Sequence, residues 1–325
     1  MSTRRLRRLL TPPAAVTLAE FDELFEAVKT WGRWGPYDQL GTFNYITPET
    51  IRRAAGLVRT GRQVSMAIPI STVAGPDNPR PAVHHMVVGH EVDIGSGGVT
   101  FAMDYLGIAC HGDCHSHMDA LCHVAYRGQL YNGRSASEVV DSTGAADLDV
   151  AAYGRGLVGR GVLLDAARHR GVPWLEPGEA VTRAELEAIE RAEGVTLSEG
   201  DILVFRTGHH RRRLDLGAWD NRMPPLGAGK AGLHVDTASW MFERRIAAFL
   251  PDGDGETVPS NVEGIHYPIH ALQVTAMGLF AADSLQLEDL SIACEAEGRW
   301  EFLVVGLPLR LPRGTGSPWN PIAIF

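Results

Sequence analysis

The sequence predicts a mixed α/β protein folded as one domain, and three observations carry this prediction. Runs rich in β-branched and aliphatic residues, bounded by Gly, Pro or Asp, alternate with segments that open on helix-start signals. The 325 residues, 45% of them hydrophobic, suffice for one large core. The 36 glycines and 19 prolines are scattered, with no linker, repeat or low-complexity block. We therefore expect a single domain over residues 1–325, in which the basic residues 1–16 form a flexible tail.

Helices are predicted where capping residues, or a proline at the first helical position, precede an amphipathic segment. The first follows the capping box Thr17-Leu-Ala-Glu20, the second opens at Thr47-Pro48 and should stop near Gly61, the third follows Thr182-Arg-Ala-Glu185 and runs toward Gly194, and the fourth extends from Pro268 to Gly278. Strands are predicted at residues 64–70, 161–167, 201–208, 245–251 and 301–311.

Composition excludes several classes of protein. A formal net charge of −9 argues against nucleic acid as a partner. No apolar run approaches the roughly 20 residues of a membrane-spanning helix. The basic start of the chain lacks the apolar stretch of a secretion signal, and four cysteines make no disulfide framework. We therefore expect a cytoplasmic protein that acts on a small molecule.

A cluster of ionisable residues lies between His111 and His123, where four of the 13 histidines and two aspartates fall within 13 residues. In an extended segment, side chains two residues apart leave the same face, so His115, His117 and Asp119 would converge, and Asp113 would join them. Imidazole and carboxylate groups that meet at one point suit Zn²⁺ or Mn²⁺. The alternative is a polar loop with incidental histidines, which this density disfavours because burial of unpaired polar groups is costly.

Thiolate ligation by Cys114 or Cys122 is a further alternative, but no CxxC pair supports it and buried, reduced cysteines are favoured. Additional ligands are expected downstream, where His270 falls in the first turn of the fourth helix and Asp283 ends a short apolar run. The acidic loop Asp252-Gly-Asp-Gly-Glu256 lacks EF-hand spacing and is interpreted as a surface turn that could border the cleft.

The segment Ser116-His-Met-Asp-Ala-Leu-Cys-His123 resembles the T-H-x-D-x-P-x-H signature of the cyclase family, which includes bacterial kynurenine formamidase and isatin hydrolase. Pro268-Ile-His270 followed by Ala282-Asp283 resembles the second signature of that family, and residues 200–208 resemble its middle strand. The similarity keeps the same order over about residues 60–310. Residues 31–35 and 316–321 resemble features of a longer subfamily of cyclases.

This resemblance implies a swivelling β/β/α fold, in which mixed sheets form a barrel-like core flanked by helices. It also implies that His117 and Asp119 bind a divalent metal and that His123 is the catalytic acid/base. Asp113 occupies the position of a further ligand that is His in the family, so Asp113 can ligate through oxygen, or His111 or His115 takes its place.

Where two metals bind in the family, the second uses a downstream His and Glu, here His270 and Asp283. Asp283 in place of the family's Glu makes this side chain one methylene group shorter. Family members form oligomers, so a homodimer or homotetramer is implied.

The leading functional hypothesis is a metal-dependent hydrolase that opens an amide, lactam or lactone. The metal, Zn²⁺ or Mn²⁺, would activate water, and His123, with an unperturbed pKa of about 6.5, would carry the proton. A second hypothesis is a metal-dependent cyclase or dehydratase, and a third is a non-catalytic metal-binding protein. The residues that bind the substrate are not identifiable from the sequence.

Overall fold

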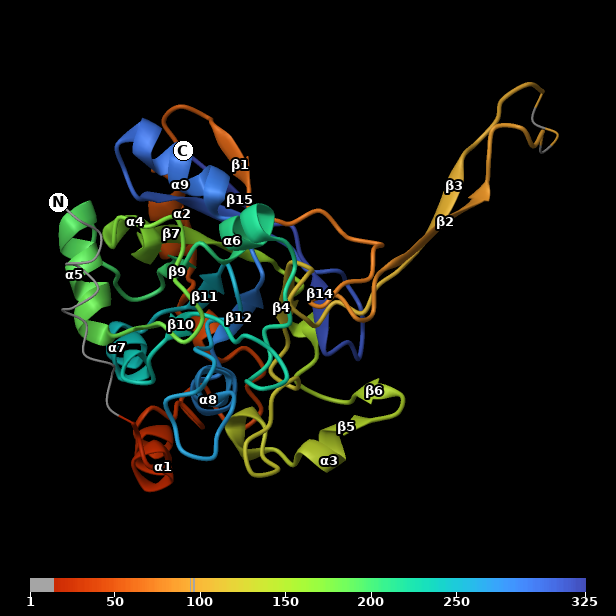
Figure 1. Cartoon of the computed structure of the whole chain (residues 1–325). Coiled ribbons are helices and arrows are strands. Elements are labelled where there is room, and N and C mark those ends of the chain that lie inside the picture. The colour runs from red at the N-terminus through yellow and green to blue at the C-terminus, as the bar shows by residue number, and fades with distance from the viewer. Residues whose placement is uncertain (1–14, 94, 96) are drawn as a thin grey trace.

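The computed structural model describes residues 15–325 except 94 and 96. Its centre is a curled, mixed sheet, which confirms the predicted α/β class, and the barrel-like core that the resemblance implies is a half-barrel (Figure 1). Within the described residues the strand order of this sheet is β1-β15-β13-β7-β9-β11-β12-β4-β14. The strands in that order are Gln63–Ser65, Ile322–Ile324, Glu301–Gly306, Leu157–Asp165, Ile202–Arg206, Ala248–Pro251, Phe280–Asp283, His117–Asp119 and Gly316–Pro318. The central strands β7, β9, β11 and β12 run parallel, and the other pairings are antiparallel.

Three smaller two-stranded sheets complete the strands of this part of the chain. They pair β2 (Val83–Val88) with β3 (Met103–Gly107), β5 (Val140–Asp141) with β6 (Gly144–Ala145), and β8 (Ala180–Val181) with β10 (Gly232–Leu233). The β2–β3 ribbon projects far from the rest of the molecule (Figure 1).

The helices surround the sheet. The α-helices are α1 (Leu18–Ala27), α2 (Pro48–Ala55), α3 (Ala136–Val139), α4 (Ala166–His169), α5 (Arg183–Glu193), α6 (His209–Leu216), α7 (Thr237–Arg244), α8 (Pro268–His270) and α9 (Glu288–Glu297). Short 3₁₀ helices are η2 (Gly41–Tyr45), η3 (Tyr131–Gly133) and η4 (Val150–Tyr153), and η5 (Ala271–Met277) is a π-helix. Among the described residues, no helix combines the length and the hydropathy needed to cross a bilayer.

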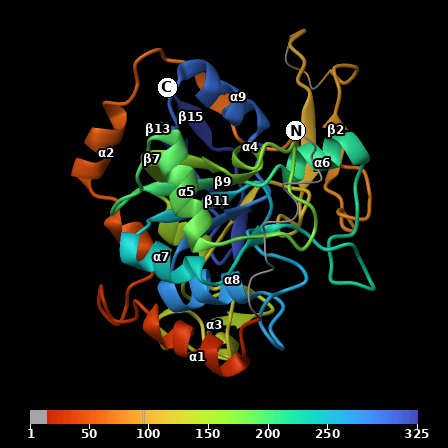
Figure 2. The same cartoon turned by 60° about the vertical axis from the view of Figure 1, so that its left-hand side comes forward.

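The central strands are buried on both faces, and alternate residues enter two separate cores. On β9, Ile202 packs into one core and Leu203 into the other, and β11 divides Ala248 and Phe249 in the same way. Side chains leave opposite faces of a strand in turn, so uninterrupted apolar runs are expected where helices cover both faces. Helices α1, α5, α7 and η5 cover one face, and α5 and α7 lie over the central strands in Figure 2. Helix α9 and the aromatic residues of η2 and η4 pack in the other core.

The predicted helix starts are confirmed. The end of the second helix differs from the prediction, because both Gly56 and Gly61 can end it. The capping boxes at Thr17 and Thr47 form, and α5 ends at Gly194 in the left-handed conformation. The second helix ends at Ala55 rather than near Gly61, with Gly56 as its C-cap. The fourth helix keeps its span, but most of it winds as the π-helix η5 before Gly278.

Each predicted strand segment contains a strand of the structure, and β1 and β13 are shorter than predicted. The expected strand at 64–70 is paired only over β1, and beyond it Ala67 forms a single bridge. The expected strand at 301–311 stops at Gly306, two residues before Pro308. Proline has no N–H to donate to a ladder, so regular pairing ends beside it. The proposed flexible tail, residues 1–16, falls largely outside the described residues.

Candidate metal centre

Strand β4 holds His117 and Asp119 on one face of the sheet and buries Met118 on the other. It lies between β12 and β14, and His117 is opposite Asp283 of β12 and Pro318 of β14. Because β12 runs parallel to β9 and β11, the carboxyl ends of the three strands meet beside β4. This edge is where ligands bind in open parallel sheets.

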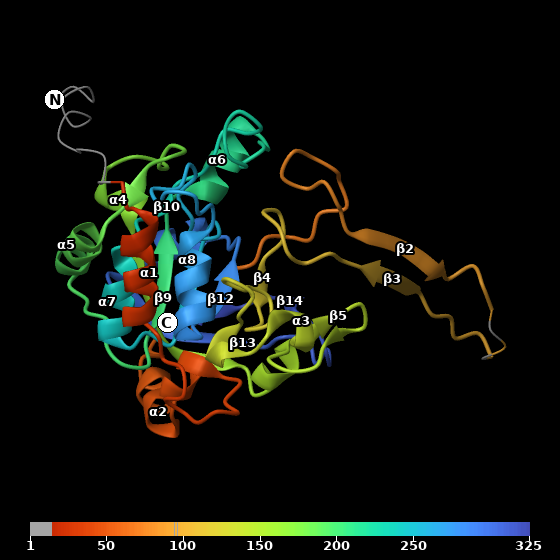
Figure 3. The ribbon, with the colours of Figure 1, turned by 90° about the horizontal axis from the view of Figure 1, so that it is seen from below.

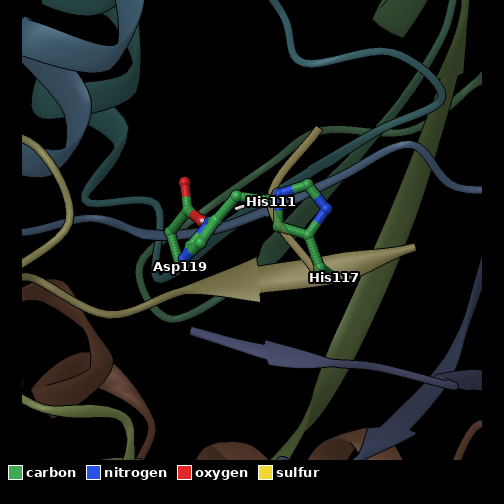
Figure 4. A group of neighbouring side chains, drawn as sticks. All are labelled: His111, His117 and Asp119. Atoms are coloured by element: carbon green, nitrogen blue, oxygen red, sulfur yellow. Dashed lines mark ion pairs between the residues drawn. The ribbon is translucent and has the colours of Figure 1, made fainter. Parts of the chain in front are cut away.

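The first group of possible metal ligands is His111, His117 and Asp119, whose ligand atoms all lie within 4.8 Å of one another (Figure 4). Nδ1 of His111 is 3.0 Å from Oδ1 of Asp119, and Nε2 of His117 is 3.7 Å from the same oxygen. His117 and Asp119 rise from the same face of β4, as their spacing of two residues predicts.

Hydrogen bonds fix which nitrogen of each imidazole faces Asp119. Nδ1–H of His117 donates to the carbonyl oxygen of His115 at 2.8 Å, which leaves Nε2 as the nitrogen with a free lone pair. Nε2 of His111 lies 3.0 Å from Oγ1 of Thr315, and its Nδ1 is directed at the carboxylate. An outer hydrogen bond of this kind sets the tautomer and orientation of a metal-binding histidine.

A second group of possible ligands consists of Asp119, His270 and Asp283. Nε2 of His270 is 3.4 Å from Oδ2 of Asp283, and the same oxygen is 3.7 Å from Nε2 of His117. Asp119 therefore belongs to both groups, and residues more than 150 positions apart in the chain meet around it.

The carboxylate of Asp119 is buried, and neither of its oxygens has a hydrogen-bond donor among the described residues. Burial alone would raise the pKa of Asp119. The neighbouring His111, His123 and His117 outweigh burial and hold the pKa below its usual value, so the group is an anion. A buried carboxylate without a donor is costly unless a cation compensates it. The mixed imidazole and carboxylate donors fit a divalent transition-metal ion.

His270 is held by the carboxylate of Glu256, the last residue of the acidic loop 252–256. Oε1 of Glu256 accepts the backbone N–H of His270 at 2.8 Å and lies 3.0 Å from its Nδ1. Glu256 is fully buried, and this burial raises its pKa above the usual value. Residues 252–256 are therefore not a surface turn, but they do border the pocket, as the sequence also allowed, because Asp254 lines it.

The carboxylate groups of the acidic loop can be buried because N–H groups of the chain donate hydrogen bonds to them. Asp252, also fully buried, accepts backbone N–H groups of Thr207, Gly208 and His209 at 2.7–2.9 Å. The loop follows the buried strand β11 directly, at the carboxyl edge of the sheet, and this position is the signal for its place beside the cleft.

His123 lies against the first group and faces the pocket. Its ring stacks on that of His111, with centroids 3.7 Å apart and planes 3° from parallel. Nε2 of His123 is 3.9 Å from Oδ1 of Asp119, and the side chain is 33% exposed. Burial lowers the pKa of His123 to about 4, against the opposing charge of Asp119, so the imidazole is neutral at pH 7 and can accept a proton.

Asp113 and His115 lie outside both ligand groups. Oδ1 of Asp113 is 3.3 Å from Nζ of the buried Lys230, which also forms an ion pair with Asp254. Nε2 of His115 lies 3.1 Å from the carbonyl oxygen of Ser71. The extended segment begins only at His117, so the alternation expected from His115 and Asp113 onward does not continue back to them.

An open pocket of about 570 Å³ lies over these groups. Its wall combines the ionisable residues with apolar and aromatic side chains that the sequence analysis did not single out. The latter are Val124, Ala125, Tyr126, Ile265, Tyr267 and Ala271. Lys230 also reaches the pocket, where the carboxylates of Asp254 and Asp113 outweigh burial and raise its pKa above the usual value.

Comparisons with known proteins agree with this architecture. A family model described as "Putative cyclase" matches residues 45–254. The crystal structure of a novel cyclase is 34% identical, covers 92% of this chain and 100% of its own, and has a TM-score of 0.80. No functionally curated protein matches the sequence.

Two isatin hydrolase structures share the fold at lower identity. Isatin hydrolase A from Labrenzia aggregata, bound to benzyl benzoate, is 20% identical over 83% of this chain and 94% of its own, with a TM-score of 0.56. An isatin hydrolase bound to the product analogue thioisatinate is 18% identical over 86% and 98%, with a TM-score of 0.55.

Proposed function

The chain belongs to the cyclase family, and from this premise we propose that it is a metal-dependent hydrolase that cleaves an amide, lactam or lactone of a small molecule. The observation that carries the proposal is the buried, donorless carboxylate of Asp119, shared by two His/Asp groups on the floor of an open pocket. The isatin hydrolases of the same fold support hydrolysis as the reaction class.

We propose His111, His117 and Asp119 as one set of metal ligands and Asp119, His270 and Asp283 as the second. His111 thus takes the place that the resemblance gave to Asp113, because Lys230 engages Asp113. A bound divalent cation would supply Lewis acidity and lower the pKa of a water molecule that it holds to about 7. Zn²⁺ and Mn²⁺ both suit these donors.

His123 serves as the acid/base of the reaction. Its neutral imidazole lines the pocket and can take a proton from the attacking water, then return that proton to the leaving nitrogen or oxygen. The stacked ring of His111 holds the imidazole plane of His123 in one orientation. Glu256 holds His270 in place through two contacts, so that its Nε2 stays directed at Asp283.

The first part of the test is metal content. The purified chain is loaded with Zn²⁺ or Mn²⁺ and freed of unbound metal. Its bound metal is then measured by inductively coupled plasma mass spectrometry. We expect bound metal in the wild type, a loss in His111→Ala and Asp119→Asn, and retention in the matched variant Asp113→Asn. A metal-free wild type would overturn the proposal, and loss in Asp113→Asn with retention in His111→Ala would restore Asp113 as the ligand.

The second part is turnover of a panel of cyclic and acyclic amides, lactams and lactones, followed by product mass. Hydrolysis adds the mass of one water to a ring-opened product. Loss of water instead would favour the cyclase or dehydratase that uses the same pocket. A metal-loaded chain that turns over no member of the panel would favour the non-catalytic metal-binding alternative.

A further inference from the structure

Lys230 is a buried lysine in the wall of the pocket, and it has no part in the reaction proposed above. Its side chain is 4% exposed. Among the described residues that line the pocket, it is the only Lys or Arg. A buried ammonium group is rare in proteins unless carboxylates accompany it. Lys230 therefore places a positive charge where a ligand would lie.

The chain fixes Lys230 at both ends. Its backbone N–H donates to the carbonyl oxygen of Val258 at 3.0 Å, and its own carbonyl oxygen accepts the N–H of Val258 at 2.9 Å. At the far end, Nζ lies 3.3 Å from Oδ1 of Asp113 and forms an ion pair with Asp254. Asp254 is itself held, because it accepts the backbone N–H of Glu256 at 3.0 Å. The ammonium group is thus positioned before any ligand arrives, as a preorganised donor requires.

The two carboxylates leave one N–H of the ammonium group for a ligand. An ammonium group has three N–H donors and no acceptor. Among the described residues, only Asp113 and Asp254 accept hydrogen bonds from Nζ. Tyr267, which also lines the pocket, has its ring centroid 5.9 Å from Nζ. The third N–H is therefore available to an oxygen atom of a molecule in the pocket.

The same carboxylates limit what Lys230 can do. Burial by itself would lower the pKa of Lys230, but Asp254 and Asp113 raise it above the usual value. The nitrogen then has no free lone pair at neutral pH, which excludes nucleophilic attack and proton abstraction. A buried ion pair also adds little net stability compared with apolar residues of similar size. Stabilisation of negative charge on a ligand remains as the role that fits the group.

The ammonium group lies beside both groups of possible metal ligands. Figure 3 shows α8, β12 and β4, which carry the ligands of the second group, next to one another. Asp113 lies in the loop directly before β4, and Asp254 lies two residues before Glu256, which holds His270. The pocket of about 570 Å³ has the size that encloses one small molecule. A single ligand can therefore contact the floor of the pocket and Lys230 together.

We propose that Lys230 donates its third N–H to the oxygen of the scissile carbonyl group and then to the carboxylate product. This assignment rests on the proposed function. When water adds to the carbonyl carbon, a proton of that water passes to His123, and the π electrons of the C=O bond move to the oxygen. The negative charge that develops on this oxygen faces the ammonium group, and Lys230 keeps all of its protons.

The second half of the reaction keeps the same contact. The oxyanion reforms the C=O bond as the C–N or C–O bond breaks, and His123 returns its proton to the leaving atom. The carboxylic acid formed in this way loses its proton to solvent. Lys230 then binds one oxygen of the carboxylate until the product leaves.

The test compares two probes of nearly equal shape, the anion benzoate and the neutral benzamide, on the full-length chain loaded with Zn²⁺. Dissociation constants are measured by ligand-observed NMR titration. In Lys230→Met, we expect the dissociation constant of benzoate to rise by about tenfold and that of benzamide by less than about threefold. The reason is that a charged donor binds an anion more strongly than a neutral acceptor. Loss of packing alone would weaken both probes alike.

A double variant separates direct contact from net charge. Lys230→Met/Asp254→Asn removes one positive and one negative charge, so the net charge of the pocket stays the same. Direct contact predicts that this variant binds benzoate as weakly as Lys230→Met does. Arg211→Met is the matched control, because it removes a cation of α6 that is 50% exposed and pairs with Asp215. It should bind both probes as the wild type does.

Kinetics on a substrate found in the panel supply a second measurement. Lys230→Met should lower kcat by about 10²-fold and change KM less, because the charge on the carbonyl oxygen is largest in the transition state. Arg211→Met should keep the kcat of the wild type. Far-UV circular dichroism establishes that each variant is folded.

Equal changes for the two probes in Lys230→Met, or recovery of benzoate binding in the double variant, would overturn the assignment. A wild type that binds benzoate no more tightly than benzamide would do the same. The Zn²⁺ content of the same samples separates these outcomes from a failure of the proposed function, which appears as a metal-free wild type. The comparison of the probes holds in either case, because contact between Lys230 and a carboxylate requires no ion.

Discussion

Asp119 is the residue on which the candidate metal centre is built, because its carboxylate belongs to both ligand groups. It is buried among histidines rather than beside Lys or Arg, so its charge is compensated by groups that can themselves bind a metal. In His117, the nitrogen that faces Asp119 is selected by the hydrogen bond that its other nitrogen donates to the carbonyl oxygen of His115. His117 thus presents a lone pair rather than an N–H group to the site.

His123 should separate metal binding from turnover. In His123→Ala we expect unchanged metal content and a fall in kcat of about 10²–10⁴-fold, because the proton acceptor is removed while the proposed ligands remain. The measurement is steady-state kinetics on the substrate found in the panel, together with metal analysis. Full activity in this variant would remove His123 from the mechanism.

Glu256 should act on the metal only through His270. Glu256→Ala removes the acceptor for both N–H groups of His270, and we expect about 10–100-fold weaker metal affinity in a chelator competition. Glu256→Gln keeps an acceptor oxygen and should lie between this variant and the wild type. Glu263→Ala, on the exposed part of the same segment, is the control and should leave the affinity unchanged. An affinity in Glu256→Ala equal to that of the control would contradict this role.

At the scale of elements, the site depends on how η5 is joined to β12. Helix η5 ends at Gly278 in the left-handed conformation, and β12 begins two residues later and ends at Asp283. The carbonyl oxygen of Gly278 accepts the N–H of Thr42 at 2.8 Å, which fixes this junction to η2. The junction therefore sets the spacing between His270, before η5, and Asp283, after it.

Gly41 is expected to tolerate no side chain at this junction. Its φ is +55°, and a Cβ atom there would lie 1.9 Å from the carbonyl oxygen of Gly278. We expect Gly41→Ala to lower the free energy of unfolding by about 2–4 kcal/mol, through backbone strain and the displaced junction. Gly61→Ala is the matched control, with φ +72° and open space around the added carbon, and should cost about 1 kcal/mol.

Denaturant unfolding monitored by circular dichroism measures both effects. Equal losses in the two variants would mean that the contact with Gly278 contributes nothing beyond the strained backbone.

At the scale of the whole molecule, the stability should depend on pH through Glu193, at the end of α5. Burial raises the pKa of Glu193 to about 8, and the nearby charge of Asp165 acts in the same direction. The ordinary value is 4.5, so between these two values the folded state binds more protons than the unfolded state. The contribution of Glu193 to stability is therefore complete below pH 4.5 and is lost as the pH rises toward 8.

Glu193→Gln should remove this slope. We expect the free energy of unfolding of the variant, minus that of the wild type, to be larger at pH 8–9 than at pH 4–5. The increase should be on the order of 1–3 kcal/mol. The measurement is the difference between the two unfolding curves across this pH range, in which the contributions of other groups cancel. A difference that stays constant with pH would contradict the prediction.

Local patterns in the sequence predicted much of this molecule. The capping residues at Thr17 and Thr182 and the proline at position 48 located three helix starts, because these signals depend on residues within one turn. The strand positions followed from apolar runs bounded by turn residues. The density of His and Asp around His117 located the candidate site, and similarity to the cyclase family supplied its second half. Sequence periodicity failed for His115 and Asp113, because the extended segment starts after them.

The sequence by itself therefore determined the α/β class, the starts of helices α1, α2, α5 and α8, the positions of the core strands β7, β9, β11 and β13, and the segment where the chemistry is concentrated. Only the tertiary structure decided that His111 faces Asp119, that Lys230 engages Asp113, and that the buried Glu256 holds His270. These contacts depend on the pairing of β4 with β12 and on loops that follow β11, which bring together residues far apart in the chain. Burial and long-range pairing are properties of the assembled sheet, and no window of local sequence contains them.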